Sequence, residues 1–183
     1  PNNPRRNIRQ QVCNGNGSKS LDFEIANISG SCATTSTLVT IDLRNQTNFT
    51  FTVEVNSSPE IYVLGGSPYA DIYHGDTTTS DTNWNYFGVV EEGASVTRTY
   101  VITNVGSCDL GITSIASDNS DFVVTTTPFP IPYSIAPYAP MVFSVTFTRH
   151  VVGAGTQTAV ISIGNTDNTN FTYTVTAEMF NEN

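Results

Sequence analysis

The sequence predicts an all-β protein, and three observations support this prediction. Apolar and polar residues alternate along many short stretches, which is the pattern of a half-buried strand. Threonine is unusually common, with 27 residues, and threonine suits a pleated, half-exposed surface. Turn residues separate the stretches at regular intervals, and no stretch shows a convincing helical period. Short strands at this spacing favour a sandwich of two sheets.

Residues 1–19 are expected to form an extended N-terminal arm, because Pro, Gly and Asn are frequent there and periodicity is weak. The arm carries a small group of positive charges on an otherwise acidic chain. These are Arg5, Arg6, Arg9 and Lys19, the last being the only lysine. Such an arm is either a solvated tail or a segment that docks on an acidic neighbour.

Residues 20–58 are expected to form a partial unit of three strands. Leu21, Phe23 and Ile25 alternate with acidic residues in the first strand. The second and third strands cover 39–43 and 49–55 and are joined by a hairpin connection. We expect the three strands to form one sheet with one apolar face, which something has to cover.

This partial unit resembles the end of the chain when it is shifted by 122 positions without a gap. Seven consecutive residues, 47–53, fall on the similar residues 169–175, and the apolar phase of all three strands agrees. The agreement indicates an internal repeat. The later copy is preceded by strands that complete a sandwich, whereas the earlier copy is not. Its apolar face is therefore covered by the rest of this chain, by a sheet or strand of another molecule, or by strands upstream in a longer array.

Residues 59–183 are expected to form the complete sandwich, beginning after the break at Ser57-Ser58-Pro59. Its central strand covers 96–104, with Tyr100 and Ile102 directed inward. The proline-rich run 129–140 is expected to cross between the sheets. The other strands are expected at 60–64, 87–90, 110–115, 122–126, 141–148, 157–163 and 171–177.

Several segments of this second unit resemble the bacterial choice-of-anchor D family and, more loosely, the immunoglobulin-like (Ig-like) domains of the hydin type. The resemblance covers about residues 59–178, and it depends on the order and spacing of the segments. The segments are Pro59–Val63, His74–Thr78, Phe87–Val90, Val96–Gly106, Leu110–Ile115, Ser134–Pro137, Val145–Thr148 and Ala159–Ile163. The sequence departs from the family pattern in the turn Pro137–Pro140 and at Arg149.

The resemblance implies an exported, non-catalytic Ig-like β-sandwich, of a kind often repeated in large bacterial surface proteins. On this basis the first three strands form a partial Ig-like unit. Because the departures lie in turns, they leave the expected fold unchanged. However, a function that the family carries on those loops is not expected of this chain.

The composition of the chain agrees with an extracellular or cell-surface location. The formal net charge is -9, which is unfavourable for binding nucleic acid or anionic membranes. No apolar run reaches the roughly 20 residues that span a bilayer, so we expect no membrane insertion. Neither a signal peptide nor an initiator methionine is present, and we expect a mature or excised chain.

Three cysteines are present, and in an exported protein we expect Cys13 to pair with Cys32. Cys108 is then unpaired. It is either a small buried apolar residue after a turn or one half of an intermolecular bridge. The spacing of the three cysteines matches no zinc motif.

The loop between 67 and 86 contains two groups of candidate site residues. Asp71, Asp76 and Asp81 could supply oxygen ligands to Ca²⁺, although we favour an ordinary polar loop in which these side chains cap turns. The second group is aromatic, and it either stacks on a polysaccharide or makes a protein contact at the end of the sandwich. It consists of Tyr69, Tyr73, Trp84 and Tyr86.

The sequence contains no catalytic signature. His74 and His150 are far apart, and no Gly-x-Ser-x-Gly elbow accompanies them. We therefore expect a non-catalytic extracellular subunit that needs no cofactor. It would associate with copies of itself or with neighbouring domains in a surface filament, sheath or adhesin array. The alternatives are a carbohydrate-binding module and a passive spacer in a large surface protein.

Overall fold

The computed structural model describes residues 32, 35–41, 48–148, 154–167 and 170–179. These residues form twelve strands and no helix, so the predicted all-β class is confirmed. The strands β1 (Thr35–Ile41) and β2 (Phe49–Val55) form a sheet of their own. The other ten strands form a sandwich. The predicted arm 1–19 and the predicted strand at 20–25 lie outside the described residues.

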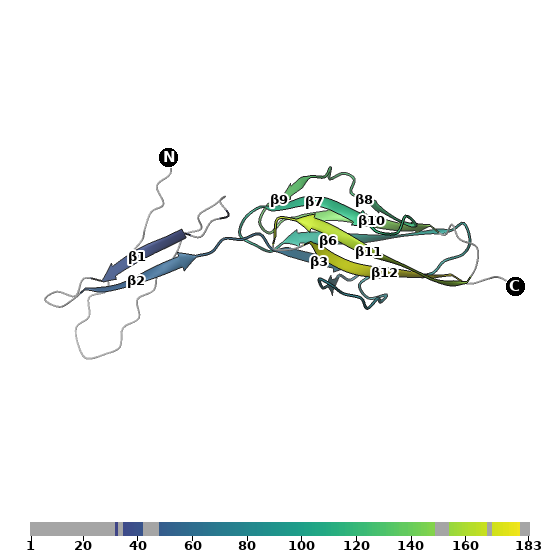
Figure 1. The fold of residues 1–183 in the computed structure, drawn as a ribbon, viewed down its shortest axis with the longest axis horizontal. Coiled ribbons are helices and arrows are strands. Elements are labelled where there is room, and N and C mark those ends of the chain that lie inside the picture. Colours follow the sequence, from purple (N-terminus) through teal and green to yellow (C-terminus); the bar gives the residue numbers. More distant parts are fainter. Residues whose placement is uncertain (1–31, 33–34, 42–47, 149–153, 168–169, 180–183) are drawn as a thin grey trace.

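The sandwich consists of two sheets of five strands each (Figure 1). One sheet has the order β4 (Ala70–Ile72), β3 (Ile61–Gly65), β6 (Ser95–Asn104), β10 (Pro140–Thr148) and β8 (Phe122–Thr125). The other has the order β5 (Tyr86–Val89), β12 (Phe171–Met179), β11 (Gly155–Asn165), β7 (Leu110–Ser117) and β9 (Tyr133–Ile135). Neighbouring strands are antiparallel except for β12 and β5, which are parallel.

The core lies between the two sheets and is built by the alternation seen in the sequence. Tyr100 and Ile102 of β6 point inward and are fully buried, as predicted. The Tyr100 ring stacks on Phe143 of β10 and meets Tyr173 of β12, with centroid distances of 5.4 Å in both cases. A large buried side chain contributes roughly 1.5–3 kcal/mol relative to its exposed state. The burial of these side chains therefore holds the two sheets together.

The outer strands of the sandwich are short. β4 and β9 have three residues and β5 and β8 have four, whereas β6 has ten and β11 has eleven. Short edge strands offer few free backbone groups to another chain. Strand addition at the sandwich edges is therefore disfavoured. The sequence did not predict β4 and β9, and β9 lies inside the proline-rich run, at a sheet edge where proline is tolerated.

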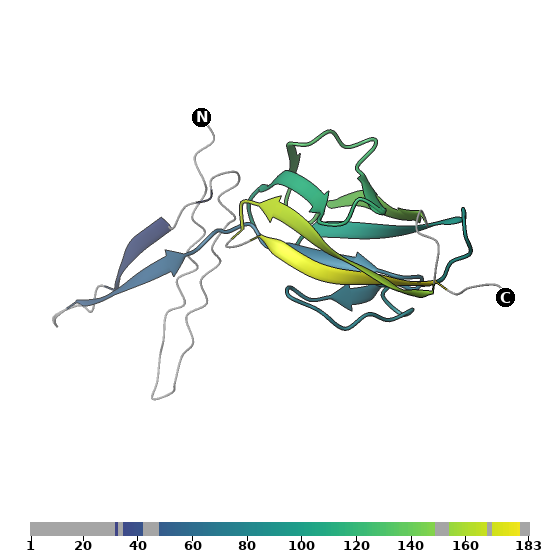
Figure 2. The same ribbon diagram turned by 45° about the vertical axis from the view of Figure 1, so that its right-hand side comes forward.

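The β1–β2 hairpin lies beyond one end of the sandwich in both views (Figures 1 and 2). We expected its strands to share one sheet with a strand at 20–25. In the second unit the counterpart of that strand is β10, which lies in the sheet opposite to β11 and β12. The three equivalent strands of the second unit are thus divided between two sheets, and the predicted strand at 20–25 of the first unit lies outside the described residues.

Candidate interaction surface and its junction

The β1–β2 hairpin reproduces the pairing of the β11–β12 hairpin residue for residue. Each of its pairs becomes a β11–β12 pair when the repeat offset is added to both numbers. Val39 opposite Phe51 corresponds to Ile161 opposite Tyr173. A slip of one residue would turn every side chain to the other face. The shared register therefore means that the two hairpins direct equivalent residues to equivalent faces.

We use the term hairpin surface for the apolar side chains that β1 and β2 direct to one face. They are Val39, Ile41, Phe49, Phe51 and Val53. No side chain described in β1 and β2 is buried. Phe49 is 56% exposed, whereas Phe171, the same residue at the equivalent position of β12, is 6% exposed. Because residue type and register are the same, the difference comes from what lies over each hairpin.

The β11–β12 hairpin is covered on its inner face and flanked on both edges. The ring of Tyr100 lies over Tyr173, and the ring of His74 lies 5.7 Å from Phe171. β7 pairs with β11, and β5 pairs with β12. Among the residues that the structure describes, β1 and β2 have no strand neighbour other than each other. The described strands therefore place a second sheet over the β11–β12 hairpin, whereas β1 and β2 form a two-stranded sheet of their own.

The turn after β6 is organised by the fully buried side chain of Asn104. Its Nδ2 donates hydrogen bonds to the carbonyl oxygens of Cys108 at 2.7 Å and Ile135 at 2.9 Å. Its Oδ1 accepts from the backbone N–H groups of Gly106 at 3.0 Å and Glu60 at 3.3 Å. The amide is fully satisfied. It fixes the turn to β9 and to the residue that precedes β3.

The linker between β2 and β3 is joined by backbone hydrogen bonds to the turn after β6. The N–H of Val105 donates to the Glu60 carbonyl at 2.9 Å, and the N–H of Ser107 donates to the Ser58 carbonyl at 3.0 Å. Gly106 lies between these two bonds. A Cβ atom there would stand 2.3 Å from the Ser58 oxygen and 2.6 Å from the Glu60 nitrogen. The linker can approach this closely because position 106 has no side chain.

A disulfide joins Cys32, three residues before β1, to Cys108 in the turn after β6. The predicted pairing of Cys13 with Cys32 is therefore wrong, and Cys13 lies outside the described residues. Cys108 is buried, as one reading of the sequence expected, but it is bonded and not a free thiol. The two positions are 76 residues apart and are brought together by the fold. No local spacing in the sequence could show this proximity.

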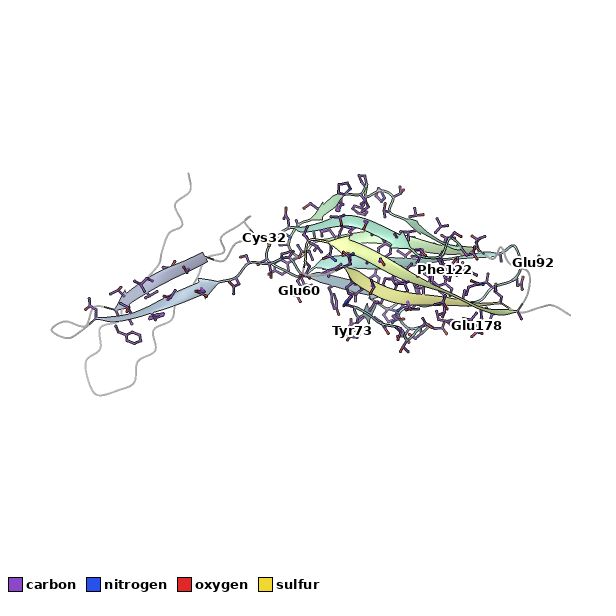
Figure 3. All side chains as sticks on the ribbon, viewed as in Figure 1. Cys32, Glu60, Tyr73, Glu92, Phe122 and Glu178 are labelled. Carbon is purple, nitrogen blue, oxygen red and sulfur yellow. A yellow bond between two sulfur atoms is a disulfide. The ribbon has the colours of Figure 1, made fainter. Side chains whose placement is uncertain are left out.

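The hairpin is therefore attached to the sandwich at one end by two covalent routes, the linker and the disulfide. Cys32 and Glu60 lie at this end in Figure 3, and Glu92 and Glu178 lie at the opposite end. A further bond fixes the start of β3, where the N–H of Ile61 donates to Oδ2 of Asp167 at 3.1 Å. We call this group of contacts the junction. It restricts the direction in which the hairpin surface can face.

Two of the three carboxylates considered for a calcium site, Asp71 and Asp76, take separate structural roles. Asp71 accepts hydrogen bonds from the hydroxyls of Tyr62 and Tyr73, and these bonds raise the pKa of both tyrosines above the ordinary value. Oδ1 of Asp76 accepts from the N–H of Thr78 at 2.9 Å, which caps a turn. Within the described part of the chain, which includes Asp81, no group of three or more His, Cys, Asp or Glu side chains could hold a metal ion.

The four aromatic residues of the loop region differ in their surroundings. Tyr69 and Tyr73 are 64% and 66% exposed. The guanidinium of Arg98 lies 5.3 Å over the ring of Trp84, so one face of that ring is covered. Burial, followed by a hydrogen bond to Glu178, raises the pKa of Tyr86. Among the described side chains, no ring contact joins two of these four aromatics.

The side chain of His74 makes a structural contact. Its Nδ1 accepts a hydrogen bond from the N–H of Thr172 at 3.1 Å, so it fixes the loop to β12. His150 lies outside the described residues. Sequence reasoning also did not single out Asn104 and Gly106. The sequence placed a turn before Cys108, but nothing in it indicated that a distant linker packs on this turn.

A comparison with protein families identifies the family of the sandwich. A profile described as HYDIN/CFA65/VesB-like, Ig-like domain matches residues 80–178, more than half of the chain. The chain belongs to this family. The predicted resemblance to Ig-like domains of the hydin type is therefore confirmed. No curated protein matches the chain.

Solved structures with a similar arrangement of strands share little sequence with this Ig-like chain. A protein of unknown function from Porphyromonas gingivalis W83 is 14% identical, with 84% of this chain and 68% of the other covered and a TM-score of 0.48. The Vibrio cholerae VesB protease is 13% identical, with 58% and 31% covered and a TM-score of 0.39. Domains 4 and 5 of the S-layer protein SbsC are 12% identical, with 80% and 58% covered and a TM-score of 0.38.

In the described residues, no helix has the length and apolar character needed to cross a membrane.

Proposed function

We propose that this Ig-like chain is a non-catalytic structural module of the bacterial cell surface, which acts by association between β-sheets in a filament, sheath or adhesin array. The observation that carries the proposal is the β1–β2 hairpin, which forms a sheet of its own with no third strand at either edge among the described residues. The sandwich itself, with its short edge strands, offers less backbone for association. Association therefore centres on β1 and β2.

The junction supports this role because it fixes the hairpin with respect to the sandwich. A buried asparagine, a close backbone approach at Gly106 and a disulfide act at the same place. A flexible spacer needs none of these contacts. The disulfide also supports an oxidising, extracellular location. The finer assignment to the choice-of-anchor D type is part of the proposal, and it rests on the order of the sequence segments that resemble that family.

The test is the association state of the purified chain, measured by light scattering and sedimentation velocity over a wide concentration range. We expect the chain to associate as its concentration rises, because about 25 cal/mol is gained per Å² of apolar surface removed from water. The double variant Val39→Asp/Phe51→Asp places charges on the hairpin surface and should remain monomeric. A folded chain that stays monomeric at high concentration would contradict the proposal.

The matched control is Thr40→Asp/Thr52→Asp. These threonines lie on the other face of the same two strands, and their counterparts Ser162 and Thr174 lie on the outer face of the sandwich. The control adds the same charge to the same hairpin. It should associate as the unmodified chain does. If both variants lose association equally, net charge and not the hairpin surface is responsible.

A further inference from the structure

We infer that the outer face of the edge strand β4 and its neighbour β3 binds a neutral polysaccharide, through Tyr62, Asp71 and Tyr73. The inference goes beyond the proposed function and does not depend on it, because it concerns the sandwich and not the β1–β2 hairpin. It begins from the two hydrogen bonds that the carboxylate of Asp71 accepts from the two tyrosine hydroxyls. Figure 3 shows Tyr73 at the lower margin of the sandwich.

The register of β3 and β4 explains why side chains from two strands meet at Asp71. Leu64 of β3 lies opposite Asp71 of β4, and directly opposed residues of antiparallel strands share a face. Tyr62 is two residues from Leu64 and shares that face. Tyr62 is therefore a diagonal neighbour of Asp71, at a separation that an aromatic side chain can reach. Tyr73 reaches the same carboxylate from the residue that follows β4.

The hydrogen bonds to Asp71 hold the two tyrosines in place on the surface. The hydroxyl of Tyr62 donates to Oδ1, and the hydroxyl of Tyr73 donates to Oδ2 at 3.1 Å. These bonds raise the pKa of both tyrosines, so both hydroxyls remain donors. Tyr73 is nevertheless 66% exposed. A side chain that is fixed before binding loses less conformational entropy when a ligand arrives.

Asp71 keeps hydrogen-bonding capacity for a ligand. An ionised carboxylate has about four acceptor positions, and the two tyrosines occupy one on each oxygen. One position therefore remains on each oxygen, and two adjacent acceptors match two neighbouring hydroxyl groups of a sugar ring. The C–H face of a sugar ring is apolar and can stack on the exposed ring of Tyr73, whose face is electron-rich. A saccharide presents both of these features together.

The charge of the surface determines which class of saccharide it can take. Among the described residues, the only Lys or Arg side chain is Arg98, and its guanidinium lies over the ring of Trp84. The whole chain has a formal net charge of -9. An acidic polysaccharide would therefore be repelled by Asp71 and by the chain. A cationic group would gain little from a single exposed carboxylate. A neutral polysaccharide meets no repulsion and can use both free acceptor positions.

The test is affinity electrophoresis of the full chain in native gels that contain a soluble polysaccharide. The neutral probes are dextran, laminarin, mannan and xylan, and the acidic probe is polygalacturonate. We expect slower migration with at least one neutral probe and unchanged migration with polygalacturonate. Calorimetric titration with an oligosaccharide of the retarding probe then gives the Kd. Unchanged migration with all four neutral probes would overturn the inference, and so would retardation by polygalacturonate.

Two variants test whether the bound saccharide lies on these residues. Asp71→Asn replaces one acceptor oxygen by a donor, and Tyr73→Ala removes the exposed ring. We expect each to raise the Kd at least about tenfold, which corresponds to about 1.4 kcal/mol. The matched controls are Glu92→Gln, which removes one exposed charge at the end of the sandwich far from the junction, and Tyr138→Ala, which removes a ring that is 74% exposed. Both controls should bind as the unmodified chain does.

The outcomes separate binding at this site from loss of fold and from nonspecific binding. Asp71 and Tyr73 are exposed, so both variants should unfold at the same urea concentration as the unmodified chain. An unchanged Kd in either variant would overturn the inference, because the saccharide would then lie elsewhere. An equal loss of binding in the two controls would also overturn it. None of these results bears on association of the chain in light scattering, which tests the proposed function separately.

Discussion

The two hairpins of this protein, β1–β2 and β11–β12, have the same register and the same apolar pattern but opposite burial. Phe49 and Phe171 occupy the same position of the repeat, and their exposed fractions are 56% and 6%. In the sandwich an opposite sheet covers the hairpin, and strands flank both of its edges. The comparison shows that local sequence determines how a hairpin pairs. Burial depends on a partner that the hairpin sequence does not contain.

The largest expected effect is the difference in stability loss between Val175→Asp and Val53→Asp. These two substitutions change equivalent positions of the two hairpins. Val175 is fully buried between the sheets, and an unpaired buried charge costs about 4 kcal/mol or more. Val53 lies on the hairpin surface, so its change should leave the sandwich within about 0.5 kcal/mol. Urea unfolding, followed by Trp84 fluorescence, measures both variants. Equal losses would mean that the hairpin is part of the sandwich core.

The next effect concerns the junction, which holds the β1–β2 hairpin at the sandwich. Asn104→Ala removes four hydrogen bonds and leaves buried N–H and C=O groups unpaired. We expect a loss of about 3 kcal/mol, because each unsatisfied buried group costs about 1–3 kcal/mol and water can reach some of them. The exposed Asn170→Ala is the control and should change stability by less than about 0.5 kcal/mol. A neutral Asn104→Ala would show that the turn does not depend on this side chain.

A smaller effect is expected from Gly106→Ala, which adds one carbon where the linker meets the turn. The new Cβ would overlap the Ser58 carbonyl oxygen, and overpacking of this kind costs about 1–3 kcal/mol. The amides of Val105 and Ser107, which bind the linker, should exchange faster with solvent. The neighbouring Val105→Ala is the control and keeps both backbone bonds. Unchanged exchange in Gly106→Ala would mean that the linker can shift without losing its contacts.

The smallest effect is expected when β12 is made to resemble β2, with Tyr173→Phe, since Phe51 is its counterpart. The Tyr173 hydroxyl is buried and makes no hydrogen bond of good geometry to the described residues. Its removal should be neutral or stabilising by about 1 kcal/mol at pH 7. A loss of 2 kcal/mol or more would show that the hydroxyl has a stabilising partner. Urea unfolding at pH 7 gives this value.

The same variant should also change the response to alkaline pH. Burial, together with the nearby Tyr100, raises the pKa of Tyr173 well above its ordinary value. The folded state therefore keeps this proton where the unfolded chain loses it, above about pH 10. The corresponding stability is fully present below about pH 10 and is lost as the pH rises beyond it. Unfolding at pH 10.5 should be less favourable for Tyr173→Phe than for the unmodified chain.

The sequence was sufficient to predict those strands in which buried and exposed residues alternate regularly. The alternation around Tyr100 and Ile102 correctly predicted the central strand and its inward face. The repeat predicted equivalent hairpins, and the structure gives them the same register. The short strand β4 was missed because three residues are too few for a period to appear. β9 was missed because a proline-rich run is usually not a strand.

The junction could not be predicted, because the contacts that attach the linker and Cys32 to the turn after β6 join segments that are distant in sequence. Cys32 and Cys108 were visible as residues, but their distance in space depends on how the turn after β6 meets the linker. Asn104 and Gly106 are ordinary residues for a turn, and their roles appear only when Ser58 and Glu60 lie beside them. For the three acidic residues of the loop 67–86, the sequence favoured turn-capping side chains over a calcium site, and the structure gives Asp71 and Asp76 separate local partners.

The disulfide between Cys32 and Cys108 has a consequence for proteolysis. It spans the linker, since Cys32 precedes β1 and Cys108 lies within the sandwich. A protease that cut the backbone between β2 and β3 would leave the N-terminal fragment bonded to the rest of the chain through sulfur. On a gel without reductant the nicked protein would still migrate as one species, and it would separate into two fragments only after reduction. Where proteases are present, such a bond would keep the hairpin connected to the sandwich after the peptide between them is broken.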